Sequence, residues 1–177
     1  SLTQGQLHAT LAQPTVLTVN GTAVSLDAVR FNVGSGSITA SGVAGNANNI
    51  VLDVNALPLS IANVVAPDLA LGGTLNGKAT ITGSASNPAI NFTADASGVQ
   101  AAAIADLGVT PITASVNGTF NDNVVTLAAF RANGAGGLQL SGLGTVPRTG
   151  NGLNVTVTGA APLALANRFV ADRGGQA

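Results

Sequence analysis

The sequence predicts an all-β fold. Apolar and short polar residues alternate along most of the chain, which is the period-two pattern of strands with two chemically different faces. The chain also holds 23 glycines, which accept the positive φ angles that hairpin turns require. Hydrophobic residues make up 46% and charged residues only 7%, yet no apolar run approaches the ~18 residues of a membrane span. We therefore expect a folded, largely apolar chain of connected strands.

Four alternating runs mark the clearest strands. They are 50–56, 90–96, 112–120 and 153–157. Within each run, Asn, Thr, Ser or Asp fills most of the positions between the apolar residues. Neighbouring residues of a strand point to opposite faces, so one face is predicted to be apolar and the other short and polar.

Asn-Gly pairs are the strongest short-range signal for a hairpin turn. Four are present: Asn20-Gly21, Asn76-Gly77, Asn117-Gly118 and Asn151-Gly152. We expect several of them to join adjacent antiparallel strands. No cysteine is present, so the fold must be held by burial and backbone pairing rather than by disulfides.

Two segments abandon the period-two pattern. Each contains Pro-Leu-x-hydrophobic-Ala-Asn, at Pro58–Asn63 and again at Pro162–Asn167. Proline at a first helical position, followed by apolar residues three to four apart, predicts a helix of one or two turns. We expect short helices over 58–65 and 162–170, and strand or turn elsewhere.

The chain also repeats itself. A shift of 101 positions lays Val19–Leu26 on Phe120–Leu127, with turn on turn and strand on strand. After small insertions in the alignment, the first Pro-Leu segment also matches the second. The predicted unit is roughly 100 residues, with 7–68 matching 112–172 and 69–111 completing the first copy. Because no linker interrupts 1–177, we expect one continuous body, and we interpret it as a segment of a longer array.

The residues offer little for catalysis, so we do not expect an enzyme. His8 is the only imidazole and has no carboxylate near it in sequence, and glutamate, cysteine, tyrosine and tryptophan are absent. The stretch Gly72–Ala79 spells G-x-x-x-x-G-K, but Ala79 replaces the Ser or Thr that ligates magnesium in a phosphate loop. We therefore predict no cofactor and no metal site. A net charge of −1 and 3% aromatic residues also argue against a nucleic-acid partner.

The apolar face is the main candidate for function. Its predicted members are Leu26, Leu52, Val54, Leu75, Ile81, Ile90, Phe92, Ile112, Val116, Phe120, Leu127, Leu140, Val155 and Val157. Period two alone fits two arrangements. These side chains can form the closed core of an ordinary sandwich, or they can line an open trough that receives apolar ligands.

A family resemblance bears on that choice. The block Gly73–Pro88, preceded by Leu57–Asn63, resembles the repeats of the TamB family, which belongs with the AsmA-like lipid-transport proteins of diderm bacteria. The shared pattern is G-x-L-x-G-x-x-x-aliphatic-x-G-[ST]-x-x-x-P after a Pro-Leu segment. The resemblance covers essentially the whole chain. It departs in the chain's low content of large aromatic residues.

The resemblance implies a β-taco, which is a U-shaped open sheet with an apolar inner face. It also implies a periplasmic segment of an inner-membrane-anchored protein of a Gram-negative bacterium, carrying phospholipid acyl chains between the two membranes. Outer-membrane protein assembly and homeostasis, with an outer-membrane partner of the TamA type, would belong to the parent protein. A different expectation is a structural β-solenoid segment of a secreted bacterial adhesin, with a closed dry core.

Overall fold

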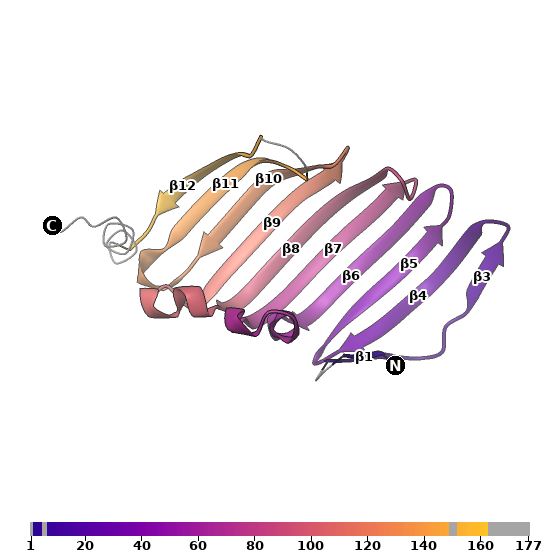
Figure 1. Cartoon of the computed structure of the whole chain (residues 1–177), viewed down its shortest axis with the longest axis horizontal. Coiled ribbons are helices and arrows are strands. Elements are labelled where there is room, and N and C mark those ends of the chain that lie inside the picture. The colour runs from indigo at the N-terminus through magenta and orange to yellow at the C-terminus, as the bar shows by residue number, and fades with distance from the viewer. Residues whose placement is uncertain (1, 5–6, 149–151, 163–177) are drawn as a thin grey trace.

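One antiparallel sheet of 12 strands makes up nearly all of the protein (Figure 1). A computed structural model describes residues 2–4, 7–148 and 152–162. The strand order is β1-β2-β4-β5-β6-β7-β8-β9-β10-β11-β12, and β3 pairs with β4 alongside β2. From β4 onward, each strand therefore lies beside the strand that precedes it in the sequence. The predicted all-β class is confirmed.

The strands are short at the N-terminal end of the sheet and long in its middle. Their bounds are β1 Leu2–Gln4, β2 Leu7–Leu11, β3 Leu17–Asn20, β4 Ala23–Val33, β5 Gly36–Ala44, β6 Asn48–Pro58, β7 Gly72–Gly83, β8 Pro88–Gln100, β9 Ile112–Asn121, β10 Val124–Asn133, β11 Gln139–Pro147 and β12 Asn154–Ala160. Four short 3-10 helices complete the described chain. They are η1 Leu59–Val64, η2 Pro67–Leu69, η3 Ala102–Leu107 and η4 Ala135–Gly137.

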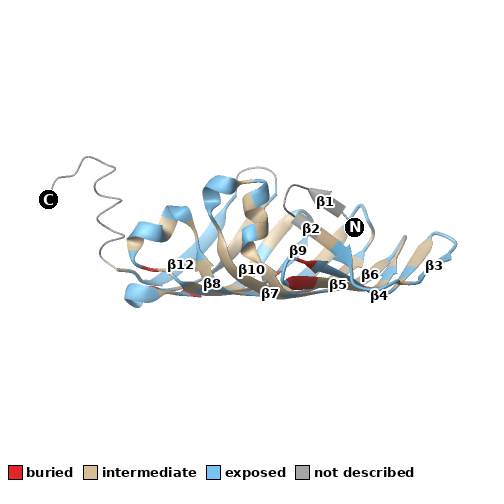
Figure 2. Ribbon diagram, turned by 90° about the horizontal axis from the view of Figure 1, so that it is seen from below, coloured by how far each residue is buried: buried red, intermediate tan, exposed pale blue. Residues whose placement is uncertain are grey.

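The connections divide between the two long edges of the sheet. All four 3-10 helices lie at one edge, in the connections that follow β6, β8 and β10. Four hairpin turns lie at the other edge, between β3 and β4, β5 and β6, β7 and β8, and β9 and β10. The turn between β4 and β5, at Gly34, lies at the 3-10 edge near Pro58. In the edge-on view, η1–η3 and β2 rise on the same side of the sheet (Figure 2).

The first predicted helix exists as η1, which begins one residue later than expected because Pro58 is its N-cap. Asn63 fixes it to the sheet. Its side-chain nitrogen donates to the carbonyl of Leu71 at 2.9 Å, and its side-chain oxygen accepts from the N–H of Leu71 at 2.8 Å. Asn63 therefore acts as a two-bond clamp just before β7 begins. The second predicted helix, over 162–170, lies outside the described residues apart from Pro162.

The predicted turns were right at one Asn-Gly pair and wrong at two. Asn20-Gly21 joins β3 to β4, with Gly21 at φ +61°. Asn76-Gly77 lies inside β7, where the Asn76 side chain accepts a 2.9 Å hydrogen bond from the N–H of Ala56. Asn117-Gly118 lies inside β9. At Asn151-Gly152 the asparagine is outside the described residues.

Four strands carry an extra residue relative to a neighbour. The register shifts between Leu26 and Val29 on β4, between Val54 and Leu57 on β6, between Ala96 and Val99 on β8, and after Leu127 on β10. Ala28 and Ala56, within the first two bulges, both have φ of +47°. This left-handed conformation is unusual for alanine, and the bulge bends the strand that carries it.

The sheet is open rather than closed on a second layer. Its accessible surface is 11121 Å², whereas a compact protein of 17.1 kDa would expose about 7,800 Å². The buried apolar residues among the described positions are Val29, Val33, Val109, Ala132 and Leu138. A closed sandwich, one of the two arrangements that fit the sequence, is therefore not what forms.

Candidate functional site: an open apolar face

The fourteen residues predicted to line the apolar face do lie on one face of the sheet. Thirteen of them belong to four rows of residues that pair directly across neighbouring strands. Residues that pair directly in antiparallel strands point to the same side of the sheet, so the members of a row share one face. Ile112 lies on the same face of β9, two and four residues before row members Ala114 and Val116. We name the rows A to D, from the hairpin edge to the 3-10 edge.

Rows A and B lie nearer the hairpin edge. Row A runs through Leu17, Leu26, Gly42, Ile50, Ile81, Ile90, Phe120, Val125 and Val146. Row B runs through Val29, Ala40, Leu52, Ala79, Phe92, Gly118, Leu127, Gly144 and Val155. Row B alternates large and small residues along its whole length, so that each large side chain has room between its two neighbours.

Rows C and D lie nearer the 3-10 edge. Row C runs through Leu11, Phe31, Ile38, Val54, Gly77, Ala94, Val116, Phe130, Gly142 and Val157. Row D runs through Leu57, Leu75, Ala96, Ala114, Ala132, Leu140 and Gly159. No polar side chain belongs to any of the four rows. The apolar face therefore runs unbroken along the stack of strands, over about 50 Å at the usual strand spacing.

The predicted lining residues are partly accessible. Twelve of the fourteen are half-buried, and Val155 and Val157, on the outermost strand, are 39% and 53% exposed. None belongs to the small buried core. Neighbouring strands shield these side chains from the sides, and no described segment covers most of them from above. Such a continuous accessible apolar surface is typical of a site that binds a ligand or partner.

The face is hollowed at its N-terminal end. There, β2 and the following connection meet β4 and β5 around a hollow of about 560 Å³. Its lining is Ala9, Leu11, Thr15, Leu17, Leu26, Val29, Phe31 and Ala40. The one polar side chain, Thr15, donates its hydroxyl to the carbonyl of Asp27 at 3.2 Å. A smaller hollow of about 90 Å³ lies near Leu75 and Phe130.

One border of the apolar face is raised. Val109, which follows η3, and Leu138, which follows η4, are buried with Ala132 of row D. A Cβ on Gly134 would lie 3.1 Å from Leu138 Cδ2 and 3.2 Å from Ile112 Cγ1, so these side chains pack tightly together. The connections with 3-10 helices thus form a low wall beside row D (Figure 2).

The opposite face is polar and carries the charges. One of its cross-strand rows runs Arg30, Thr39, Asp53, Lys78, Thr93 and Asn117. Lys78 lies 3.8 Å from an Asp53 carboxylate oxygen, and both side chains are more than half exposed. Lys78 therefore sits on a strand as an exposed ion-pair partner and not at a helix N-terminus.

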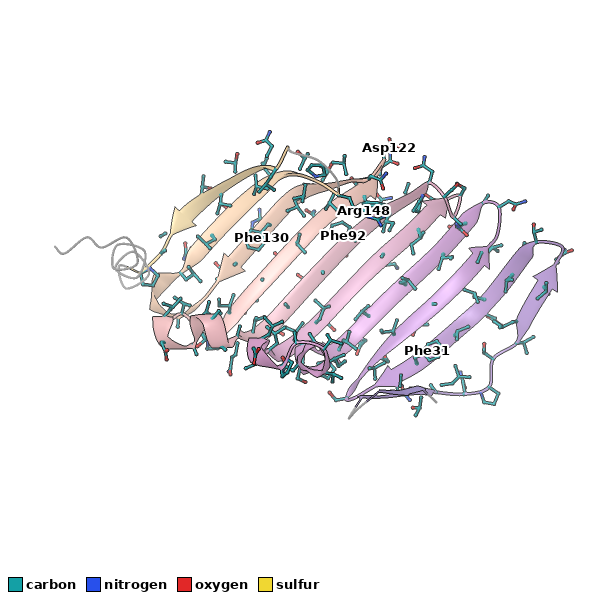
Figure 3. All side chains as sticks on the ribbon, viewed as in Figure 1. Phe31, Phe92, Asp122, Phe130 and Arg148 are labelled. Atoms are coloured by element: carbon teal, nitrogen blue, oxygen red, sulfur yellow. The ribbon has the colours of Figure 1, made fainter. Side chains whose placement is uncertain are left out.

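Several members of the apolar face were not predicted from the sequence, notably Leu11, Phe31 and Phe130. Figure 3 labels Phe31, Phe92 and Phe130, which come from three strands distributed along the sheet. Phe31 and Phe130 follow bulges, so period two counted from the start of β4 or β10 would assign them to the polar face. Their size was the only available signal, since five phenylalanines are the only aromatic residues of the chain.

The remaining chemistry of the described chain is sparse. His8 lies on β2, with its backbone opposite Thr3. Among the described residues, no three His, Cys, Asp or Glu side chains gather where they could hold a metal ion. Helices long and apolar enough to cross a membrane are also absent from that part of the chain.

Comparison of the chain with protein-family models, curated proteins and solved structures gives no match. The likeness to TamB-type repeats thus rests on the sequence motifs alone.

Proposed function

We propose that the apolar face is a conduit for lipid acyl chains, in a periplasmic segment of an envelope-spanning protein of a Gram-negative bacterium. The observation that carries this proposal is the length of the four uninterrupted apolar rows on a single-layer sheet whose apolar face is largely uncovered. The TamB-type motifs support the same proposal and add phospholipid as the cargo, a β-taco as the overall form and a TamA-type outer-membrane partner of the parent protein.

The chemistry of the rows suits transport better than fixed binding. Each methylene group that leaves water for the apolar face gains about 0.8 kcal/mol. No hydrogen-bond donor or acceptor in the rows favours one position over the next, so neighbouring positions are nearly equal in energy. An acyl chain can therefore bind and still slide along the rows, while its head group stays in water.

The chain's repetition supports a longer array of which this sheet is one part. The shift of 101 positions relates Leu26 to Leu127, and a register shift follows each of them, on β4 and on β10. The alternative, a β-solenoid adhesin, would coil the chain around a closed dry core. The described chain instead runs up and down in a single layer, which favours the conduit.

Neighbouring residues on opposite faces provide the test. A photoreactive amino acid is placed at Leu52 or Val116 on the apolar face, and at Asp53 or Asn117 on the polar face. After irradiation in the full-length parent protein in cells, phospholipid adducts should form at the first pair only. Equal adduct formation on both faces, or none on the apolar face, would refute the conduit.

A further inference from the structure

The connection between β2 and β3 breaks what is a single strand in the second copy of the repeat. Leu11, the last residue of β2, pairs with Phe31, and Leu17, the first residue of β3, pairs with Leu26. The residues between them form no strand, and Pro14 among them has no N–H to donate to a ladder. The repeat lays β3 and β4 on β9 and β10, and β9 is continuous. An interruption inside the sheet therefore distinguishes the first copy from the second.

The apolar hollow of about 560 Å³ lies at this interruption. Strand β2 rises from the sheet there (Figure 2), and β4 and β5 supply the floor. The hollow that borders β9, with Val116 in its lining, is about 90 Å³. Pockets that hold small organic ligands have volumes of about 300–1,000 Å³. The ligand-sized space thus coincides with the interrupted strand.

Two hydrogen bonds fix the connection to β4. The N–H of Ala12 donates to the carbonyl of Arg30 at 2.8 Å, and the hydroxyl of Thr15 donates to the carbonyl of Asp27 at 3.2 Å. The two acceptors lie on either side of Val29, which is only 7% exposed and anchors the floor. A wall that is in place before the ligand arrives lowers the ordering cost of binding.

The chemistry of the lining selects a hydrocarbon. Seven of the eight lining residues are apolar, and none is charged. The hydroxyl hydrogen of the eighth, Thr15, is already donated to a carbonyl. An ionised group would lose its water here without gaining a partner, so the head group of a ligand has to stay outside the hollow.

The shape of the hollow favours a chain over a compact ring system. Its lining belongs to rows A, B and C, with Leu26, Val29 and Phe31 as their members on β4, so the hollow opens onto these rows. A methylene group takes up roughly the volume of a water molecule, about 30 Å³ in the liquid, so the hollow has room for at most about 18 of them. This is the volume of one long acyl chain, not of two.

We propose that the hollow is a holding site for one acyl chain. The inference rests on the conduit proposal for its ligand class, and it adds a fixed position to a face along which chains otherwise slide. A chain in the hollow is shielded by the connection as well as by the floor, so more of its surface leaves water than on the open rows. A diacyl lipid places one chain in the hollow and the other on the rows. A fatty acid fills the site alone.

Palmitate is the probe, because it has one unbranched chain. Isothermal titration calorimetry of the whole chain, below the concentration at which palmitate forms micelles, should give one site per molecule. Ala40→Phe fills the hollow from its floor and should weaken palmitate binding at least tenfold. Ala79→Phe is the matched control, since Ala79 is also half-buried in row B but lies outside the lining, between Leu52 and Phe92. It should leave the affinity unchanged.

A second measurement needs no substitution and decides the matter if Ala40→Phe fails to fold by circular dichroism. Palmitate with a photoreactive group at its methyl end is irradiated with the unaltered protein, and the adducts are located by mass spectrometry. They should concentrate in 9–17 and 26–40. Adducts spread evenly over the strands would overturn the holding site, and so would equal palmitate affinities of folded Ala40→Phe and Ala79→Phe.

The holding site and the conduit fail separately. Several equal palmitate sites in the isolated chain, or none, would overturn the holding site, whereas phospholipid adducts at Leu52 in the parent protein would still support the conduit. Conversely, palmitate held in the hollow, with no adducts at Leu52 in cells, would establish the site and refute transport along the rows.

Discussion

Phe92 on β8 lies against Gly118, its direct cross-strand partner on β9. A Cβ built on Gly118 would be 2.9 Å from Phe92 Cζ and would also collide with the backbone carbonyl of Thr126 on β10. Gly118 therefore makes space for the largest side chain of row B and brings two strands close together. This explains why an Asn-Gly pair occurs within a strand.

Gly118→Ala should accordingly destabilise the protein by about 1–3 kcal/mol, since a methyl group there has no space. Gly72→Ala is the matched control. The nearest atom to its new Cβ would be Gln100 Cβ at 3.7 Å, an ordinary contact, and we expect a change within about 0.5 kcal/mol. Urea unfolding of both variants measures the difference, and similar midpoints would contradict the tight contact.

Leu127→Arg distinguishes an open face from a closed core. Leu127 lies between two glycines of row B, Gly118 and Gly144, and is half-buried. The arginine can extend its stem over the face and keep its charge in water, so the protein should stay folded while acyl chains are blocked. Thr126→Arg on the polar face should affect neither property.

Thermal unfolding and phospholipid crosslinking at Leu52 measure these two effects. Loss of folding in Leu127→Arg would indicate that the face is closed in solution, because an unpaired buried charge costs several kcal/mol. A folded Leu127→Arg variant with undiminished lipid adducts would exclude a conduit at this position.

Asn63→Ala should destabilise the connection between η1 and β7. It removes two hydrogen bonds to the partly buried backbone of Leu71, which together contribute about 1–3 kcal/mol. Asn91→Ala changes an exposed asparagine of β8 and should alter stability by less than about 0.5 kcal/mol. Hydrogen exchange at the Leu71 amide should rise in the first variant only; equal protection in both would contradict the clamp.

Ala28→Gly and Ala56→Gly should each stabilise the protein by about 0.5–1 kcal/mol. Alanine at φ +47° carries a left-handed penalty of roughly 1–2 kcal/mol, which exceeds the entropic cost of glycine. Ala94→Gly, in a regular part of β8, should have the opposite sign. Chemical unfolding of the three variants tests this, and a loss of stability at both bulges would refute the strain.

Within a regular stretch of strand, period two was sufficient to predict which face a residue occupies, as Leu52, Val54 and Val116 illustrate. It could not predict the register between strands, because bulges change the phase. Leu26 and Leu127 are related by the sequence repeat, yet Leu26 lies in row A and Leu127 in row B. A bulge has no distinctive sequence signal in a chain where alanine and glycine occur throughout.

The clamp and the misassigned turns have a similar cause. Asn63, Asn76 and Gly118 act through partners that are distant in the sequence, and no local pattern shows which partner a short side chain will meet. The sequence signalled Asn63 only through its place at the end of a Pro-Leu segment, and Asn76 only as half of a turn signal. In both cases the side chain forms hydrogen bonds with the backbone of a neighbouring segment.

From β3 to β12, the strand order follows the sequence, which has a consequence for folding. Every strand can pair with one that has just been formed, so the contacts are close in sequence and the contact order is low for an all-β protein. The loop closures that slow Greek-key sandwiches are not needed. The sheet can start at any central hairpin and grow one strand at a time in both directions, as repeat proteins do. During synthesis, each newly emerged strand could pair at once with the strand made just before it.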